Sequence, residues 1–194
     1  MTIQGELFRA GEPAVPGLVL VPDAVTPAEE TRLAARIDAA PLKPFEFGQW
    51  RGKRLTTHYG SAYDYQRARV TEAPPLPDWL LERREKLAPL AGLDPRALEA
   101  ALLIRYDPGA GIGWHRDRPQ YGEVLGLSLG ADCTLRLRRR TATAFERRSV
   151  LLPARSLYRL SDEVRWEWEH SIAPLDTTRR SITFRTLQPA VTSM

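Results

Sequence analysis

The residues best suited to chemistry gather in the stretch 111–117, which reads Gly-Ile-Gly-Trp-His-Arg-Asp. It holds His115, one of only three histidines in the chain, and Asp117 follows two residues later. In an extended backbone, side chains two residues apart point the same way, so both groups can face one point in space. An imidazole and a carboxylate that converge in this way supply two ligands of the facial triad that holds non-haem iron.

The third ligand must come from elsewhere, and the candidates are the two remaining histidines, His58 and His170. His170 lies in residues 166–172, a stretch able to form a strand. It follows His115 by 55 residues, enough for several strands that return the chain to the same sheet face. A lone histidine among tryptophans is more often a packed residue than a ligand. A complete triad nevertheless needs a second histidine, so both candidates stay open on these grounds.

Two arginines near the C-terminus, Arg179 and Arg185, are separated by an even number of residues. On a strand they would point to one face, with Ser181 and Thr183 between them. Six residues span roughly 20 Å, so two long side chains that lean inward could clasp a small dicarboxylate from both ends by bidentate pairing. The alternative is a solvent-facing strand with two surface arginines.

Aromatic and cationic side chains alternate in residues 44–70, and glycines punctuate the stretch, so we expect short strands or hairpins there. Aromatics interleaved with cations form a surface suited to stacking bases and holding phosphates. The alternative is a β-layer whose aromatics fill a core. The residues concerned are Phe45, Phe47, Trp50, Arg51, Lys53, Arg54, Tyr59, Tyr63, Tyr65, Arg67 and Arg69.

The elements that position these residues can be outlined. Thr26, Pro27 and Glu29 give a capped helix start, and Pro41 marks its end. A second helix is expected over 78–90, and Asp94 begins a short helical turn. The rest is expected to be β-rich, with strands at 15–21, 100–106, 124–129, 134–138, 149–152, 156–160 and 181–187. This pattern is typical of a mainly β sandwich or barrel.

Length and composition limit the class of protein. A chain of 194 residues suits one domain spanning 1–194. Its composition, with 43% hydrophobic and 27% charged residues, is ordinary for a globular protein. The net charge is +4, and of 28 basic residues three are lysines, so 25 are arginines. Arginine grips phosphates and stacks on bases, although a genome-composition bias explains the choice equally well. Cys133 is the only cysteine, which excludes an internal disulfide and a multi-cysteine zinc site.

The chain shows no signal peptide and no segment approaching the roughly 20 apolar residues of a membrane span. We therefore expect a cytoplasmic protein with no membrane partner, and a monomer.

Taken together, the order His115-x-Asp117, then His170, then Arg179-x5-Arg185 resembles the AlkB-like branch of the iron(II)- and 2-oxoglutarate-dependent dioxygenases. The likeness covers residues 103–187. It includes Tyr106 at the end of a strand before the first ligand, the sequence Leu-Ser-Leu-Gly at 127–130, and the closing strand Ser-Ile-Thr-Phe-Arg at 181–185.

The resemblance implies a double-stranded β-helix, or jelly-roll, over about 98–188, with helices near the N-terminus that buttress one side. It implies iron(II) held by His115, Asp117 and His170, and it moves His58 to the substrate side. It further implies that 2-oxoglutarate and O2 are co-substrates. The residues that would bind 2-oxoglutarate are Arg179, Arg185, Tyr106 and Ser181.

Residues 44–70 resemble the family's substrate lid, where aromatics would flank an extruded base and cations would meet the backbone. The implied substrate residues are Trp50, Arg54, Tyr59, Tyr63 and Tyr65. The implied partner is single-stranded DNA or RNA with alkylated bases, and the implied activity is oxidative removal of N-alkyl groups with release of formaldehyde, succinate and CO2.

Three positions depart from the family pattern. Ile104 and Ser181 stand where many relatives have asparagines, and Arg118-Pro119 follows the motif where base-repair members can carry an acidic residue. Base selectivity is therefore open. One alternative is a hydroxylase or demethylase of the same fold that acts on a tRNA modification or a protein. Others are a catalytically silent nucleic-acid-binding jelly-roll and a metal cupin that does not use 2-oxoglutarate.

Overall fold

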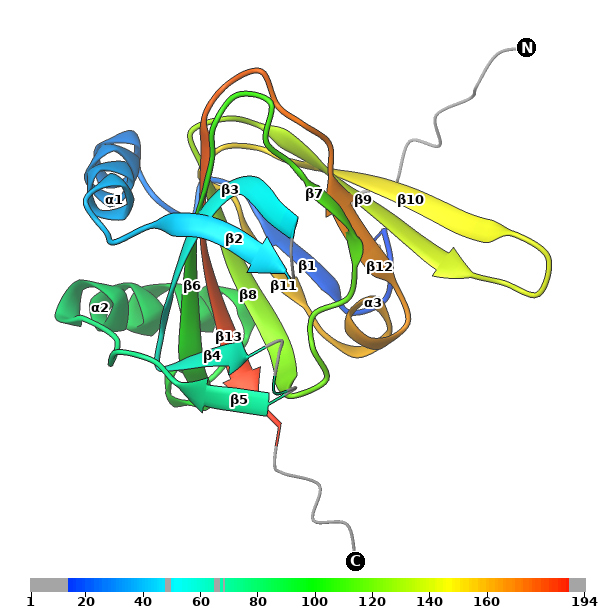
Figure 1. Ribbon diagram of the computed structural model, residues 1–194, viewed down its shortest axis with the longest axis horizontal. Coiled ribbons are helices and arrows are strands. Elements are labelled where there is room, and N and C mark those ends of the chain that lie inside the picture. The colour runs from blue at the N-terminus through cyan, green and yellow to red at the C-terminus, as the bar shows by residue number, and fades with distance from the viewer. Residues whose placement is uncertain (1–13, 48–49, 65–66, 68, 189–194) are drawn as a thin grey trace, which may run out of the picture.

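The computed structural model describes residues 14–47, 50–64, 67 and 69–188. Two antiparallel sheets dominate it (Figure 1). The larger sheet has seven strands in the order β1 (Leu18–Val21), β11 (Leu157–Leu160), β8 (Tyr121–Leu129), β13 (Arg179–Leu187), β6 (Leu98–Tyr106), β3 (Trp50–Tyr59) and β2 (Lys43–Phe47). The smaller has the order β10 (Phe145–Leu152), β9 (Cys133–Arg140), β12 (Glu169–Ile172) and β7 (Ile112–His115). A separate hairpin pairs β4 (Ser61–Asp64) with β5 (Arg69–Glu72).

The two sheets pack face to face, as expected for a mainly β fold and consistent with a double-stranded β-helix. Leu135 and Leu137 of β9 share one buried cluster with Val124 of β8 and Leu160 of β11, which joins the sheets at one end. A smaller cluster around Leu102 and the neighbouring inward residues of β6 lies against Ile112 of β7. Residues of both clusters also line a cavity between the sheets.

Helices cover the other face of the larger sheet, which confirms the expected buttress. Leu33 and Ile37 of α1 (Pro27–Asp38) and Leu80 and Leu87 of α2 (Asp78–Leu87) join the core cluster formed by the outward residues of β6, β8 and β13. Burying aliphatic side chains of this size contributes about 1.5–3 kcal/mol each. The helices therefore hold the sheet rigid from behind.

The start of α1 follows the sequence signals. Thr26 and Glu29 form the predicted capping box, in which the Thr26 hydroxyl accepts from the Glu29 N–H and the Glu29 carboxylate accepts from the Thr26 N–H. Arg83 of α2 donates to Glu29 at 2.6 Å, and these hydrogen bonds together lower the pKa of Glu29 to about 2. One carboxylate thus caps α1 and fixes α2 beside it.

Some boundaries differ from the predicted ones. The first strand begins at Leu18, because Gly17 turns the chain with φ +85° and a Cβ there would lie 2.1 Å from the Ser161 carbonyl oxygen. The second helix ends at Leu87 and continues as a 3-10 turn, Ala88–Ala91, closed by Gly92 with φ 70°. Residues 166–172 are not one strand, since α3 (Asp162–Trp166) precedes β12.

The predicted lid segment also divides. Within 44–70, β3 pairs with β6 from Leu55 to Tyr59 and so belongs to the larger sheet, whereas β4 and β5 form their own hairpin. The part of the chain described by the structure contains no helix long and apolar enough to cross a membrane.

Candidate metal centre

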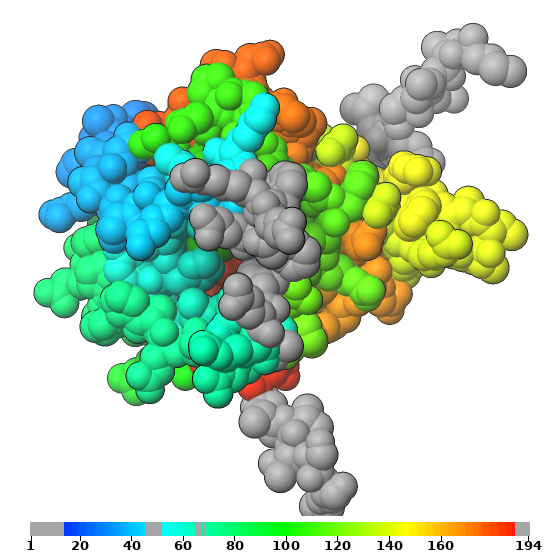
Figure 2. Space-filling model, in the orientation of Figure 1, coloured from blue at the N-terminus to red at the C-terminus, as the bar shows by residue number. Residues whose placement is uncertain are grey.

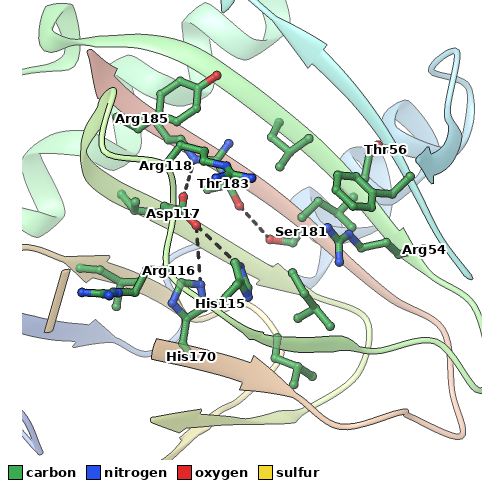
Figure 3. Close-up of a pocket in the computed structure, with 18 of the residues that line it drawn as sticks. Arg54, Thr56, His115, Arg116, Asp117, Arg118, His170, Ser181, Thr183 and Arg185 are labelled. Carbon is green, nitrogen blue, oxygen red and sulfur yellow. Dashed lines mark hydrogen bonds and ion pairs between the residues drawn. The ribbon is translucent and has the colours of Figure 1, made fainter. Parts of the chain in front are cut away.

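The smaller sheet brings two histidines into direct opposition. In the antiparallel ladder between β7 and β12, His115 stands opposite His170, and the ring centroids are 4.2 Å apart. The chain leaves β7 at His115, and two residues later the Asp117 Oδ1 atom lies 3.7 Å from Nε2 of each imidazole. The ligand atoms of the three residues all lie within 4.8 Å of one another, close enough to share one metal ion (Figure 3).

Neighbouring groups fix the orientation of these ligands. The Nδ1 atom of His115 is 2.9 Å from the Gly113 carbonyl oxygen, so an Nδ1–H there donates to it and leaves the Nε2 lone pair facing Asp117. On the other side, Arg185 of β13 donates from Nε to Asp117 Oδ2 at 2.6 Å. One carboxylate oxygen is therefore held by the larger sheet and the other faces the histidines.

The protonation states suit metal binding. Burial lowers the pKa of His170 to about 3 and also lowers the pKa of His115, so both imidazoles are neutral near pH 7. Burial alone would raise the pKa of Asp117, but the Arg185 guanidinium holds it below its usual range. Two neutral imidazoles and one carboxylate are the donor set of the facial triad, which leaves positions on the ion open to other ligands.

The three residues lie in the wall of a cavity of about 510 Å³ between the sheets. This volume is within the range of small-molecule sites. Ser181, Thr183 and Arg185 of β13 enter it along one wall, as the even spacing predicted (Figure 3). Its other walls come from β3, β6, β8 and β11, and they include Arg54, Thr56, His58, Ile104, Tyr106, Tyr121, Val124, Tyr158 and Leu160.

The two predicted arginines of β13 are placed differently from each other. Arg185 pairs with Asp117, whereas Arg179 is 1% exposed and lies beneath the ring of Tyr106, 5.2 Å from its centroid. Its Nε donates to Ser128 Oγ at 3.0 Å, but its buried Nη2 has no hydrogen-bond partner among the residues described. A buried guanidinium N–H without an acceptor is costly. Arg179 is not itself among the residues that line the cavity, but Tyr106 and Tyr158, which contact it, are. A ligand carboxylate that passes between these two rings would supply the missing acceptor.

Sequence reasoning missed Tyr158, which lines the cavity from β11. Burial raises the pKa of its phenol, so the hydroxyl keeps its proton and can donate to a carboxylate. The sequence pattern that could have identified Tyr158 is the alternation of side chains in the predicted strand 156–160, where Tyr158 and Leu160 face the same side. Gly126 of β8 makes room for this ring, since a Cβ there would lie 2.2 Å from the Tyr158 Cζ atom.

We predict that Gly126→Ala destabilises the protein by about 1–3 kcal/mol, because the added methyl overpacks a buried ring. The free energy of unfolding from urea titrations measures the change. Gly126→Ala combined with Tyr158→Val should recover most of the loss, since the smaller side chain removes the clash. A double variant as unstable as the single one would show that Tyr158 is not the neighbour that requires glycine.

The predicted substrate residues are only partly brought together. Arg54 and Tyr63 line the cavity, and so does His58. Burial lowers the pKa of His58 to about 4, and this histidine is not part of the metal-ligand cluster. Tyr59 does not reach the cavity, because odd-numbered residues of β3 face the helices and Tyr59 packs against that core. Tyr65 lies outside the described residues, and so does the side chain of Trp50.

Comparison with known proteins agrees with this geometry. A family model for the 2OG-Fe(II) oxygenase superfamily matches residues 17–186. The chain belongs to this superfamily. Its similarity to proteins named for ALKBH8 and ALKBH6 makes it an AlkB-like member, and the His-Asp-His triad makes it a 2-oxoglutarate-dependent dioxygenase. Iron(II) and 2-oxoglutarate are accordingly its cofactor and co-substrate.

The similar proteins are mostly larger. A Xenopus tropicalis tRNA (carboxymethyluridine(34)-5-O)-methyltransferase alkbh8 is 31% identical over 82% of this chain and 25% of its own length. An Arabidopsis thaliana alkylated DNA repair protein, ALKBH8 homolog, is 29% identical over 81% of this chain and 51% of its own. A Danio rerio probable RNA/DNA demethylase ALKBH6 is 33% identical over 63% of this chain and 50% of its own length. The AlkB-like chain thus spans a quarter to a half of these relatives.

Solved structures support the fold. That of OsALKBH1 superposes with a TM-score of 0.67 at 16% identity, covering 89% of this chain and 97% of the other. The structure of a Pseudomonas putida prolyl-4-hydroxylase superposes with a TM-score of 0.59 at 21% identity, covering 89% of this chain and 93% of the other. What the three structures share is the mainly β fold. In this AlkB-like chain, His115, Asp117 and His170 are the residues that could hold a metal ion.

Proposed function

We propose that this dioxygenase removes N-alkyl groups from bases of single-stranded DNA or RNA. The observation that carries the proposal is the composition of the cavity wall beside the triad. Arg54 lies 4.0 Å from the centroid of the Phe45 ring, and Arg118 lies 5.0 Å from that of Tyr63. Aromatic rings paired with guanidinium groups suit a base that stacks and a phosphate that follows it.

Electrostatics at the cavity favour a polyanion. Arg54, Arg116, Arg118 and Arg185 line it, and among the described lining residues Asp117 is the only carboxylate. Among these lining residues, four guanidinium groups therefore stand against one carboxylate, which pairs with Arg185. A strand of nucleic acid brings a negative charge on every nucleotide and is attracted by such an excess.

We also assign roles to the residues that would bind 2-oxoglutarate, from their positions in and beside the cavity. Arg179 and Tyr158 would bind the distal carboxylate of 2-oxoglutarate, with Tyr106 forming the wall above Arg179. Ser181 is 1% exposed, and its hydroxyl lies 3.4 Å from that of Thr183, so the pair offers a polar strip along the co-substrate. Arg185 would hold Asp117 in its ligating position rather than clasp 2-oxoglutarate.

When bound, iron(II) with 2-oxoglutarate and O2 supplies the oxidation: one oxygen atom goes to succinate, formed with CO2, and the other to the N-methyl carbon. The resulting hydroxymethyl group leaves as formaldehyde and restores the base. The protein's own residues orient the reactants. The Phe45–Arg54 and Tyr63–Arg118 pairs would flank the base, and the apolar Ile104 and Val124 would limit water beside the reacting carbon.

A panel of single-stranded oligonucleotides, each with one N-methylated base, tests the proposal. We expect at least one to lose its methyl group, with formaldehyde and succinate formed in equal amounts, as measured by mass spectrometry and product assay. The His170→Ala variant is the control for contaminating activity. Succinate formed with another substrate, and no reaction on any methylated base, would reject the proposal.

A second candidate substrate class is favoured by the names of relatives. The ALKBH8 proteins of Xenopus tropicalis and Mus musculus, 31% and 28% identical, are named for the modified uridine 34 of tRNA. The second candidate is therefore hydroxylation of a carbon substituent on a tRNA base, by the same triad and the same co-substrate. Nucleoside analysis of bulk tRNA before and after incubation distinguishes it, because the modified nucleoside gains one oxygen atom and no formaldehyde appears.

A further inference from the structure

The outer face of the smaller sheet carries a line of arginines that the active site does not use. Along β9, Leu135 and Leu137 are buried between the sheets, so Arg136, Arg138 and Arg140 lie on the opposite, outer face. The β9–β10 register places Arg147 opposite Arg138 and Phe145 opposite Arg140. We call Arg136, Arg138, Arg140 and Arg147, with Trp114 and Phe145, the outer stripe.

The two aromatic rings hold these four guanidinium groups. Arg136 and Arg138 lie 5.3 and 4.5 Å from the centroid of Trp114. Around the Phe145 ring, the distances are 4.6 Å for Arg138, 5.4 Å for Arg140 and 5.6 Å for Arg147. Contacts of this kind orient a guanidinium plane over a ring and leave its N–H edge able to face a ligand.

The charge of the outer stripe is poorly balanced. Arg138 pairs with Glu169 at 2.5 Å and Arg136 donates to Ser171 Oγ, but across the described ranges no carboxylate lies within ion-pair distance of Arg136, Arg140 or Arg147. The inner-face neighbour Arg139, by contrast, contacts three carboxylates: Glu146, Glu163 and Glu167. Like charges opposite each other on a sheet are destabilising, so this excess suits an anionic partner rather than the fold.

The outer stripe starts at the active site. Trp114 lines the cavity and directly precedes the ligand His115, while Arg140 and Phe145 lie at the far end of the β9–β10 hairpin. This hairpin projects from the body of the molecule, as the yellow and yellow-green arm in Figures 1 and 2 shows. Because β7 is the edge strand of the smaller sheet, a chain-like ligand with one unit in the cavity could pass this edge at Trp114 and continue across the outer face toward β9 and β10.

We propose that the outer stripe binds the sugar–phosphate backbone of a single-stranded polynucleotide whose target base occupies the cavity. The partner is identified by charge complementarity, because each arginine offers a planar fork of donors that matches phosphate oxygens. Trp114 and Phe145 add faces on which flanking unpaired bases stack. The inference rests on the proposed function, and it adds a docking surface outside the cavity that extends the bound strand beyond the target nucleotide.

The test compares two double variants of the full chain that remove the same charge. Arg140→Gln/Arg147→Gln changes the exposed end of the outer stripe, and Arg32→Gln/Arg36→Gln changes two exposed arginines of α1, on the opposite side of the molecule. Fluorescence anisotropy measures binding of an unmethylated single-stranded oligodeoxynucleotide about 12 nucleotides long over a range of salt concentrations. The same sequence as RNA forms a parallel arm.

We expect the outer-stripe variant to bind about tenfold more weakly at low salt. Loss of two phosphate contacts should also reduce the slope of log K against log salt by about 1.4. The α1 variant should bind like the wild type. Phe145→Leu, which keeps the charge, should weaken binding and leave the slope unchanged. Equal weakening by both double variants, or an unchanged slope for the outer-stripe variant, would overturn the proposal.

A methylated trinucleotide, too short to reach the hairpin, separates this inference from the proposed function. Suppose that the outer-stripe variant oxidises the trinucleotide at the wild-type rate and binds the longer oligonucleotide as tightly as the wild type does. The proposed docking surface is then rejected, and the proposed demethylation is retained. If no methylated base is oxidised by any form of the protein, yet only the outer-stripe variant loses binding, demethylation is rejected and the docking surface stands.

Discussion

Replacing His170 by alanine is expected to remove iron binding and reduce turnover at least about a thousandfold while the fold survives. Loss of a supporting residue around a metal typically costs 10–100-fold, and His170 is itself one of three ligands. Its imidazole is neutral and mostly buried, so its removal leaves a small cavity and no unpaired charge. Anaerobic titration with iron(II) and 2-oxoglutarate, followed by the visible charge-transfer band, measures the loss.

Asp117→Ala provides the informative contrast. It should remove iron binding as completely, but it also leaves the Arg185 guanidinium, 13% exposed, without the Oδ2 atom that accepts from it at 2.6 Å. Removing one partner of a buried ion pair costs about 3 kcal/mol or more. The metal-free Asp117→Ala protein should therefore unfold at a lower urea concentration than metal-free His170→Ala. Equal midpoints would show that the ion pair with Arg185 does not contribute to the fold.

The parts of the fold predicted correctly depend on local chemistry. Thr26 and Glu29 specify the start of α1 within four residues, and the alternation of Leu135 with Arg136 and Leu137 specifies which face of β9 is buried. Signals of this kind involve residues close in sequence, so no knowledge of the tertiary structure is needed. The same holds for His115 and Asp117, whose spacing alone brings them to one side.

Pairing across the sheets could not be predicted from the residues alone. The residue types alone leave His58 and His170 both open as the third ligand, and only the resemblance to the family favours His170. In the structure, strand register separates them: β12 places His170 opposite His115, whereas β3 places His58 opposite Leu102 in the other sheet. Arg185 lines the cavity as predicted, but its contact with Asp117, 68 residues earlier, could not be predicted, because nothing local shows that the two residues meet. The prediction that Tyr59 lies at the substrate has a similar origin. Which side chains of β3 face the cavity, the odd-numbered or the even-numbered ones, is known only once the pairing of β3 is known.

Arg179→Met is expected to change stability and co-substrate affinity in opposite directions. The side chain is 1% exposed and one buried nitrogen has no hydrogen-bond partner among the described residues, so the metal-free protein carries a poorly compensated charge. Replacing such a charge with an apolar side chain of similar length is expected to be neutral or stabilising, because the desolvation penalty of the guanidinium is no longer incurred. Affinity for 2-oxoglutarate should nevertheless fall at least about 100-fold, or 2.7 kcal/mol, because the distal carboxylate loses its charged partner.

Arg180→Met is the matched control, one residue away on the opposite face of β13. Arg180 pairs with Asp38 of α1 through two hydrogen bonds of 2.8 and 2.6 Å, so its loss should lower stability and leave 2-oxoglutarate binding unchanged. Titration of the iron-loaded protein with 2-oxoglutarate and with pyruvate, which lacks the distal carboxylate, sharpens the comparison. Only Arg179→Met should lose the preference for 2-oxoglutarate. A variant that keeps this preference would show that the distal carboxylate binds elsewhere in the cavity, and the unpaired nitrogen of Arg179 would then require another acceptor.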